Sequence, residues 1–343
     1  MSADDYEFCP RCEANLTLQK GFSRELPNWI CKGCGEMLIN PDMEGDSDIV
    51  WICDGCGATL NVQKGFSEQC GQWKCEICGF DNTIDDSEIY LSEDEYQAEL
   101  ENPYRGISDE AALELSSYEE ISQIENHNNI SIVKDIENGN IYIRKILDIY
   151  NADIYKYFYD NPVNGMPEIM AVYESERYLI VIEEYIEGRT LSDILDNGPV
   201  RKEAAVAIVQ RVWEIVCSLH RLNPPVIHRD IKPENVIISP QGKVYLLDIN
   251  AAKWYDSDSK EDTVLLGTKY YAAPEQYGFG DTSSSEKTDV YALGVLLNKL
   301  VTGSFPKEKM AEGAIGEIVR DCIWLDAEKR LTDRELMERL EKL

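Results

Sequence analysis

The chain has 343 residues, of which 43% are apolar and 28% charged, which is enough for two or three compact units with their own cores. Its 64 acidic and 33 basic side chains give a formal net charge of −31, and such a surface repels phosphate backbones and anionic lipid, which argues against nucleic acid as a partner. No stretch reaches the roughly 18 apolar residues of a membrane span, and the first residues lack the pattern of a secretory signal, so we expect a cytoplasmic protein with reduced thiols.

Eight of the 11 cysteines form four CxxC pairs that begin every 22 residues. A longer repeat of 44 residues relates residues 16–23 (LTLQKGFS) to residues 60–67 (LNVQKGFS), which indicates two copies of one unit. Each copy reads as CxxC, an 18-residue spacer and CxxC, the pattern of a four-cysteine zinc site. The predicted ligands are Cys9, Cys12, Cys31 and Cys34 in the first copy and Cys53, Cys56, Cys75 and Cys78 in the second.

Two alternatives to this pairing exist. The spacer between Cys34 and Cys53 is also 18 residues long, so the inner pairs could share one ion, although the 44-residue repeat favours sequential pairing. Disulfide or redox-active CxxC pairs are disfavoured by a reducing compartment. Closed four-sulfur sites are structural. We therefore expect two structural Zn²⁺ ions in zinc ribbons over residues 1–42 and 43–86, and a protein partner for this module.

Residues 87–116 are expected to form an acidic linker. Residues 85–120 carry 13 acidic side chains and one basic side chain, Arg105, with helical patterns at 92–101 and 108–116. The simple interpretation is a solvated spacer. The alternative is an acidic segment that binds a basic patch on a partner.

From about residue 117 the pattern changes. Apolar alternation at 130–133 and 141–143 predicts two strands joined by a turn at 137–140, and a further strand is expected at 178–183. Long helical patterns begin near residues 201 and 288. A small part rich in sheet thus precedes a larger helical part.

Residues 228–235 read HRDIKPEN, and this segment resembles the catalytic loop of the eukaryotic-type (Hanks-type) serine/threonine protein kinases. Further landmarks follow in that family's order: residues 248–250 (DIN), 267–275 (GTKYYAAPE) and 289–294 (DVYALG), with Arg330 at the place of an arginine that pairs with the glutamate of the second segment. The resemblance covers residues 117–343. It implies an α+β, bilobal protein-kinase-like fold, with a small sheet-rich lobe and a larger helical lobe, preceded by the two zinc-ribbon β modules.

The resemblance also implies an activity, transfer of the ATP γ-phosphate to Ser and Thr hydroxyls of a protein substrate with Mg²⁺ or Mn²⁺. Asp230 would orient the acceptor hydroxyl and take its proton, and Lys232 would reach the transferred group. Asn235 and Asp248 would hold the metal ion with oxygen ligands. Lys145 is similar to the strand lysine that binds the α- and β-phosphates.

The adenine-binding hinge is expected at Glu184 and Ile186, through backbone groups. Glu183 then falls behind the adenine ring, where a carboxylate needs a partner. Lys232 and Thr268 favour a serine or threonine acceptor, and autophosphorylation is expected within residues 257–268.

Two departures from the family pattern concern the phosphates. Residues 121–133, the expected glycine-rich loop, contain no glycine. The acidic partner of Lys145 is expected to be Asp153, with Asp160 as second choice. These departures leave a pseudokinase or nucleotide-dependent scaffold as the alternative function, and a kinase fold that attaches another part of the nucleotide as a third.

Overall fold

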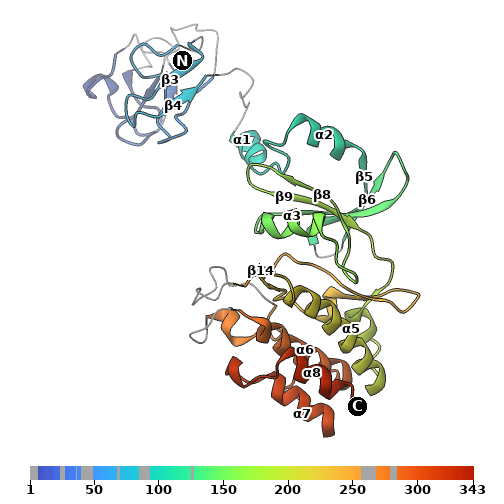
Figure 1. Ribbon diagram of the computed structural model, residues 1–343. Coiled ribbons are helices and arrows are strands. Elements are labelled where there is room, and N and C mark those ends of the chain that lie inside the picture. Colours follow the sequence, from blue (N-terminus) through green and yellow to red (C-terminus); the bar gives the residue numbers. More distant parts are fainter. Residues whose placement is uncertain are drawn as a thin grey trace. The chain divides into compact units, whose positions relative to one another are not determined.

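The computed structural model describes residues 7–23, 28–35, 37–39, 49–67, 70–84, 93–124, 127–255, 268–278 and 284–343. The chain divides into two compact units, Met1–Leu100 and Glu101–Leu343 (Figure 1). The division falls inside the predicted acidic linker. No helix of the described ranges is long and apolar enough to cross a membrane.

The first unit contains the same small module twice. Its elements are β1 (Asn28–Ile30), β2 (Met37–Ile39), β3 (Gln72–Lys74), β4 (Asp81–Thr83) and α1 (Glu93–Leu100). Strands β1 and β2 pair antiparallel, as do β3 and β4. Phe22 meets Trp29 edge-on with ring centroids 5.5 Å apart, and Phe66 meets Trp73 in the same way at 5.4 Å. The equal geometry 44 residues apart shows that the sequence repeat is a structural repeat.

The second unit begins with α2 (Asp109–Ser116) and a five-stranded antiparallel sheet. The strands are β5 (Tyr118–Ile124), β6 (His127–Asp135), β7 (Ile141–Leu147), β8 (Ile169–Glu174) and β9 (Leu179–Glu184), in the spatial order β5-β6-β7-β9-β8. Helix α3 (Ala152–Asp160) lies beside β8 (Figure 1).

Strand β9 is buried on both faces because its side chains alternate between two clusters. Leu179 and Val181 belong to the main core with α3, whereas Ile180 and Ile182 pack with Leu115 of α2. These four of the six residues of β9 are 0% exposed. Covering helices on both sides explain why the strand reads as a continuous apolar run.

The larger lobe is built on long helices that pack together (Figure 1). Its helices are α4 (Leu191–Leu195), α5 (Lys202–His220), α6 (Glu286–Thr302), α7 (Gly313–Cys322) and α8 (Asp333–Leu340). Its short strands are β10 (Arg189–Thr190), β11 (Val226–Ile227), β12 (Val236–Ile238), β13 (Val244–Leu246) and β14 (Lys253–Trp254). Helix α6 is central, with most of its residues buried, and it ends at Gly303, whose φ of 74° favours glycine.

The expected elements are found in these positions. The strands predicted at 130–133 and 141–143 lie within β6 and β7, the strand predicted at 178–183 matches β9 with a shift of one residue, and the two long helical patterns are α5 and α6. The predicted α+β bilobal fold with two small β modules before it is therefore confirmed. The expected autophosphorylation segment, apart from Thr268, lies outside the described residues.

Candidate active site

The loop that carries Asp230 lies between β11 and β12 and is hydrogen-bonded to the first turn of α6. Asp289, fully buried, accepts hydrogen bonds from the backbone amides of His228 and Arg229, both at 2.8 Å. The side chain of Gln276 donates to the carbonyl of Arg229 at 2.8 Å. Arg229 has a φ of 70°, a costly conformation for a non-glycine residue, and these bonds fix it.

Three side chains gather around the Asp230 carboxylate. Lys232 Nζ lies 2.7 Å from one oxygen, and Asn235 Nδ2 donates to the same oxygen at 3.0 Å. The Thr268 hydroxyl donates to the other oxygen at 2.7 Å and accepts from Lys232 Nζ, also at 2.7 Å. The sequence placed Asp230, Lys232 and Asn235 in one site, and the structure brings them together. It adds Thr268 as the bridge between the acid and the lysine.

The second centre of the site is Lys145 on β7. Its ammonium lies 2.9 Å from Glu183 and 3.6 Å from Asp248, so the strand lysine and the DIN aspartate face each other. Lys145 pairs in register with Val181 of β9, which makes Glu183 its diagonal neighbour on the same face of the sheet. The partner that Glu183 requires is therefore Lys145.

Burial and charge oppose each other in this cluster. Burial alone lowers the pKa of Lys145, but attraction by Glu183 and then Asp248 outweighs it and raises the pKa above the usual range. Burial raises the pKa of Glu183. Burial also acts to raise the pKa of Asp248, yet the positive charge of Lys145 gives a net lowering, so Asp248 is ionised at neutral pH.

The structure places Asp153 away from Lys145. Asp153 is exposed in the first turn of α3, whereas Lys145 is buried, and the carboxylates that contact Lys145 are Glu183 and Asp248. The second choice, Asp160, is exposed at the end of the same helix. Tyr155, on the buried face of α3, is 0% exposed; burial raises the pKa of its phenol and the charge of Lys145 opposes that shift. The acidic partner therefore comes from the sheet and not from α3.

Two oxygen-bearing side chains, those of Asn235 and Asp248, could hold a divalent metal ion. The side-chain nitrogen of Asn235 donates hydrogen bonds to Asp230, so the side-chain oxygen of Asn235 is available for another contact. The backbone amide of Leu247 donates to the Asn235 carbonyl at 2.7 Å, so Asp248 follows directly beside Asn235. An ionised carboxylate and an amide oxygen are ligands that Mg²⁺ and Mn²⁺ accept, so these residues fit the ion that the family implies.

The expected hinge follows the inner strand β9, and the expected phosphate loop belongs to β5 and β6. Glu184 ends β9 and Ile186, almost buried, follows it. Strands β5 and β6 remain paired out to Ile124 and His127, with register shifts along β5. Residues 125 and 126, between them, lie outside the described ranges. Residues 121–124 and 127–133 of the expected phosphate loop thus belong to two paired strands and contain no glycine.

Two sets of buried charged groups support the site, and the sequence indicated one of them. Arg330 contacts both oxygens of Glu275, at 2.6 and 2.8 Å, as the resemblance implied. His220 at the end of α5 lies between Asp289 at 2.9 Å and Asp333 of α8 at 2.7 Å. Burial alone lowers the pKa of His220, but the hydrogen bonds to the two carboxylates raise it to about 10. His220 carries no signal in the sequence, because no local pattern pairs it with residues this far away.

The eight predicted cysteine ligands form two separate clusters, one from each copy of the repeat. Within each cluster the sulfurs lie within 4.8 Å of one another, for example 3.5 Å between Cys9 and Cys34 and 3.8 Å between Cys56 and Cys75. A tetrahedral zinc ion with bonds of about 2.3 Å separates its sulfurs by about 3.8 Å. The donor sets fit zinc, and sequential pairing is the arrangement found.

Each cysteine cluster has the same supporting glutamine, which the sequence repeat contained but did not explain. Gln19 donates to Cys31 Sγ at 3.4 Å and accepts from the Trp29 indole at 2.9 Å. Gln63 repeats both contacts with Cys75 and Trp73, at 3.3 and 2.9 Å. The hydrogen bond from Gln19 is the chief cause that lowers the pKa of Cys31 to about 6.

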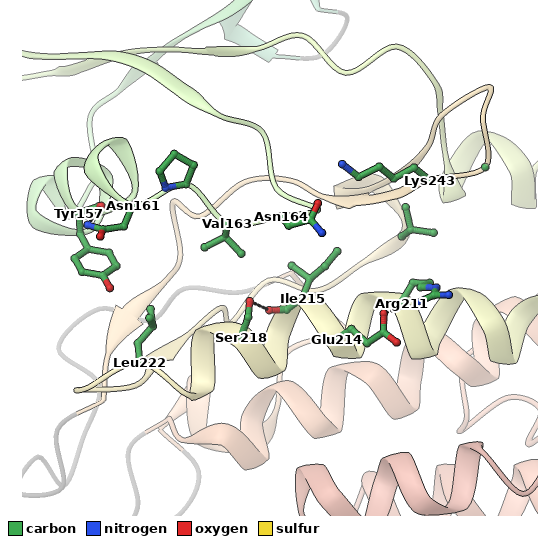
Figure 2. Close-up of a pocket in the computed structure, with 14 residues that line it drawn as sticks. Tyr157, Asn161, Val163, Asn164, Arg211, Glu214, Ile215, Ser218, Leu222 and Lys243 are labelled. Carbon is green, nitrogen blue, oxygen red and sulfur yellow. Dashed lines mark hydrogen bonds and ion pairs between the residues drawn. The ribbon is translucent and has the colours of Figure 1, made fainter.

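A pocket of about 720 Å³ lies apart from the Asp230 cluster. It is bordered by the connection after α3, by the face of α5 that carries the ion pair between Arg211 and Glu214, and by the turn at 242–244 (Figure 2). None of the predicted site residues lines it. The pocket is therefore not part of the candidate active site.

Comparison with known proteins agrees with this geometry. The family described as protein kinase domain matches residues 163–338, which is half of the chain. Serine/threonine-protein kinase PknL of Mycobacterium tuberculosis is 37% identical over 143 residues, 40% of this chain and 35% of that protein. Serine/threonine-protein kinase PrkC of Bacillus subtilis is 35% identical over 146 residues, 41% and 22% of the two chains.

Serine/threonine-protein kinase shk1/pak1 of Schizosaccharomyces pombe is 32% identical over 139 residues, 39% of this chain and 20% of that protein. Each match thus spans about a third or less of the relative's length. The fold, the Asp230 cluster and the matched family define the class: the chain belongs to the protein kinase family. The cysteine modules and the sheet edge with β5 lie before the matched range.

Proposed function

We propose that the chain is a serine/threonine protein kinase that transfers the γ-phosphate of ATP to Ser and Thr hydroxyls of a protein. The observation that carries this proposal is the close approach of Lys145 to Asp248 at 3.6 Å, next to the Asp230 cluster. Residues from β7, from the loop after β11 and from the loop after β13 thereby face one site. Phosphoryl transfer requires such positioned charges more than covalent chemistry.

Each residue has a role in this proposal. ATP with Mg²⁺ or Mn²⁺ supplies the phosphoryl group and part of the charge neutralisation. Asp230 orients the acceptor hydroxyl and takes its proton, while Lys232 places a positive charge beside it. Asn235 and Asp248 hold the metal ion. Lys145 directs a permanent ammonium toward the nucleotide phosphates.

Glu183 takes the role that the sequence assigned to Asp153. It holds the ammonium of Lys145 from the neighbouring strand at 2.9 Å. Glu184 and Ile186 are the adenine-binding segment in this proposal, through their backbone groups.

Transfer of labelled phosphate from ATP with Mg²⁺ tests the proposal. Wild-type protein is expected to label a mixed set of Ser, Thr and Tyr peptides on serine and threonine. Asp230→Asn and Asp248→Asn are expected to lose at least 100-fold in rate, in the range typical of a lost catalytic acid–base or metal ligand. Asp196→Asn, a change at the exposed acid that caps the C-terminus of α4, is the matched control and is expected to keep full activity.

A pseudokinase is the second candidate, and the absence of glycine from residues 121–133, whose described members lie on the paired strands β5 and β6, favours it. In that case the protein binds a nucleotide or a partner without transfer. Labelling that is absent from the wild type with either metal ion, together with ATP binding by calorimetry, would favour this function over the kinase.

The two cysteine modules are proposed to be structural zinc ribbons that bind a protein partner. Residues 1–88 hold 17 acidic and 6 basic side chains, so nucleic acid is repelled. Metal analysis of purified protein is expected to give two zinc ions per chain. One ion or none would contradict the ribbon assignment, and a salt-sensitive mobility shift with RNA or DNA would contradict the protein partner.

A further inference from the structure

An exposed group of lysines and aromatic rings lies directly beside Thr268. We call it the lysine–aromatic face and define it as Lys269, Tyr270, Phe305 and Lys307. Lys269 and Lys307 place their ammonium groups 5.1 and 4.2 Å from the centre of the Tyr270 ring. Tyr270 is 45% exposed and packs on Phe305 with ring centroids 5.0 Å apart. Two positive charges are thus held over one exposed ring by cation–π contacts.

The backbone holds this face in place next to the reacting groups. Tyr270 has a φ of 76°, a strained value for a tyrosine, and the amides of Tyr271 and Ala272 both donate to the Thr268 carbonyl at 3.0 Å. The Thr268 hydroxyl is itself bonded to Asp230. One residue step spans about 3.8 Å, so Lys269 lies within a few residues' reach of an acceptor hydroxyl at Asp230.

The positive charges of Lys269 and Lys307 are not neutralised by an ion pair within the described residues. In the described part of the chain, no carboxylate lies within ion-pair distance of Lys269 or Lys307. Both side chains are exposed. Two acids of neighbouring segments are engaged elsewhere in the site: Glu308 accepts a hydrogen bond from the Phe305 amide, and Glu234 adds to the effect of burial in raising the pKa of Tyr271.

The strongly negative charge of the whole chain makes this local group of positive charges unusual. With a formal charge of −31, most of the surface repels a segment rich in carboxylates. Such a segment is attracted only where cations gather, and the lysine–aromatic face is a place where they gather beside the candidate catalytic group.

We propose that the lysine–aromatic face selects acceptor segments that carry Asp or Glu within about three residues of the Ser or Thr. The proposal rests on the kinase function above and names its substrate class. The chain itself contains such a segment at residues 92–95 (SEDE), which supplies a natural test sequence.

Three synthetic peptides test the selection with the full-length protein. The first has the sequence of residues 89–98, in which Ser92 is the one Ser or Thr acceptor. In the other two, Glu93, Asp94 and Glu95 are replaced by three glutamines or by three lysines. We expect kcat/KM to fall in the order acidic, glutamine, lysine, with at least ten-fold between the first and the last.

Charge reversal on the enzyme completes the test. Lys269→Glu and Lys307→Glu are each expected to lower kcat/KM for the acidic peptide by about two- to five-fold, the range for exposed charge pairs, and to leave the glutamine peptide within two-fold. Lys342→Glu, an exposed lysine near the end of α8, carries the same charge change and is expected to alter nothing. Thermal melting of each variant checks that it is folded.

The outcomes separate the two proposals. Equal rates on all three peptides, or a preference for the lysine peptide, would refute the selection and leave the kinase function intact. Loss of acidic-peptide activity in Lys342→Glu as large as in Lys269→Glu would also refute it. Wild-type protein that labels no Ser or Thr substrate at all would refute the kinase function, and the selection with it.

Discussion

Replacing Glu183 by glutamine tests how Lys145 is held. Gln has nearly the same shape as Glu but no charge, so the change removes one of the two carboxylates at the buried ammonium. At an effective dielectric constant of about 20, unit charges 2.9 Å apart attract by about 6 kcal/mol. Desolvation cancels part of this attraction, and breaking a buried pair from one side costs about 3–5 kcal/mol.

The second carboxylate reduces that cost. Asp248, 3.6 Å from the ammonium, takes over part of the attraction, so we expect a loss of about 2 kcal/mol in transition-state stabilisation. That loss is a fall in kcat/KM for ATP of about 30-fold. Lys145 then competes with the metal ion for Asp248, so the Mg²⁺ concentration for half-maximal rate should rise.

Initial rates of peptide phosphorylation over a matrix of ATP and Mg²⁺ concentrations measure both effects. Asp153→Asn is the matched control, since Asp153 is exposed on α3, and it should stay within two-fold of wild type. Full activity in Glu183→Gln, or an equal loss in Asp153→Asn, would show that the pair with Lys145 has another role.

Three further predictions concern stability. His220→Gln should destabilise the chain by about 3 kcal/mol at pH 6. The pKa of His220 in the folded chain, about 10, lies above the ordinary 6.5. The difference in melting temperature between the variant and the wild type is therefore complete below pH 6.5 and disappears as the pH rises through 10. Arg330→Met leaves Glu275 buried without its cation and should cost about 3–5 kcal/mol, whereas the neighbouring exposed Lys329→Met should cost less than about 0.5 kcal/mol in the same denaturant titration. Removal of zinc by a chelator should unfold the cysteine modules, seen as loss of near-ultraviolet dichroism from Trp29 and Trp73, because units this small depend on their metal; an unchanged spectrum would contradict a structural role for the metal.

Much of the fold was accessible from sequence because its signals are local. The CxxC spacing and the 44-residue repeat predicted two cysteine modules, and the apolar run of β9 predicted a buried strand. The HRDIKPEN segment placed Asp230 and Asn235 five residues apart on one loop, and the structure shows them in contact. In a short motif of this kind, the spacing along the chain largely determines which side chains can meet.

The pairing of Lys145 with Glu183 could not be read in the same way. It depends on β7 lying beside β9 in a register that sets Lys145 opposite Val181, and neither fact is encoded within one segment. The sequence showed only that each of the two charges needed a partner. The exposure of Asp153 did have a signal: Ile154, Tyr155 and Phe158 form one apolar face of α3, and Asp153 falls outside it.

The contact between Asp289 and the backbone of His228 and Arg229 has a consequence for local opening. These two amides are bonded to a buried carboxylate inside the helical lobe, so their protons can exchange with solvent only when α6 separates from the loop. We expect them to exchange about as slowly as the most protected amides of α6, whereas amides at the exposed tip of β5 exchange through local fraying. The loop that bears the proposed base would thus keep its shape until that lobe unfolds as a whole.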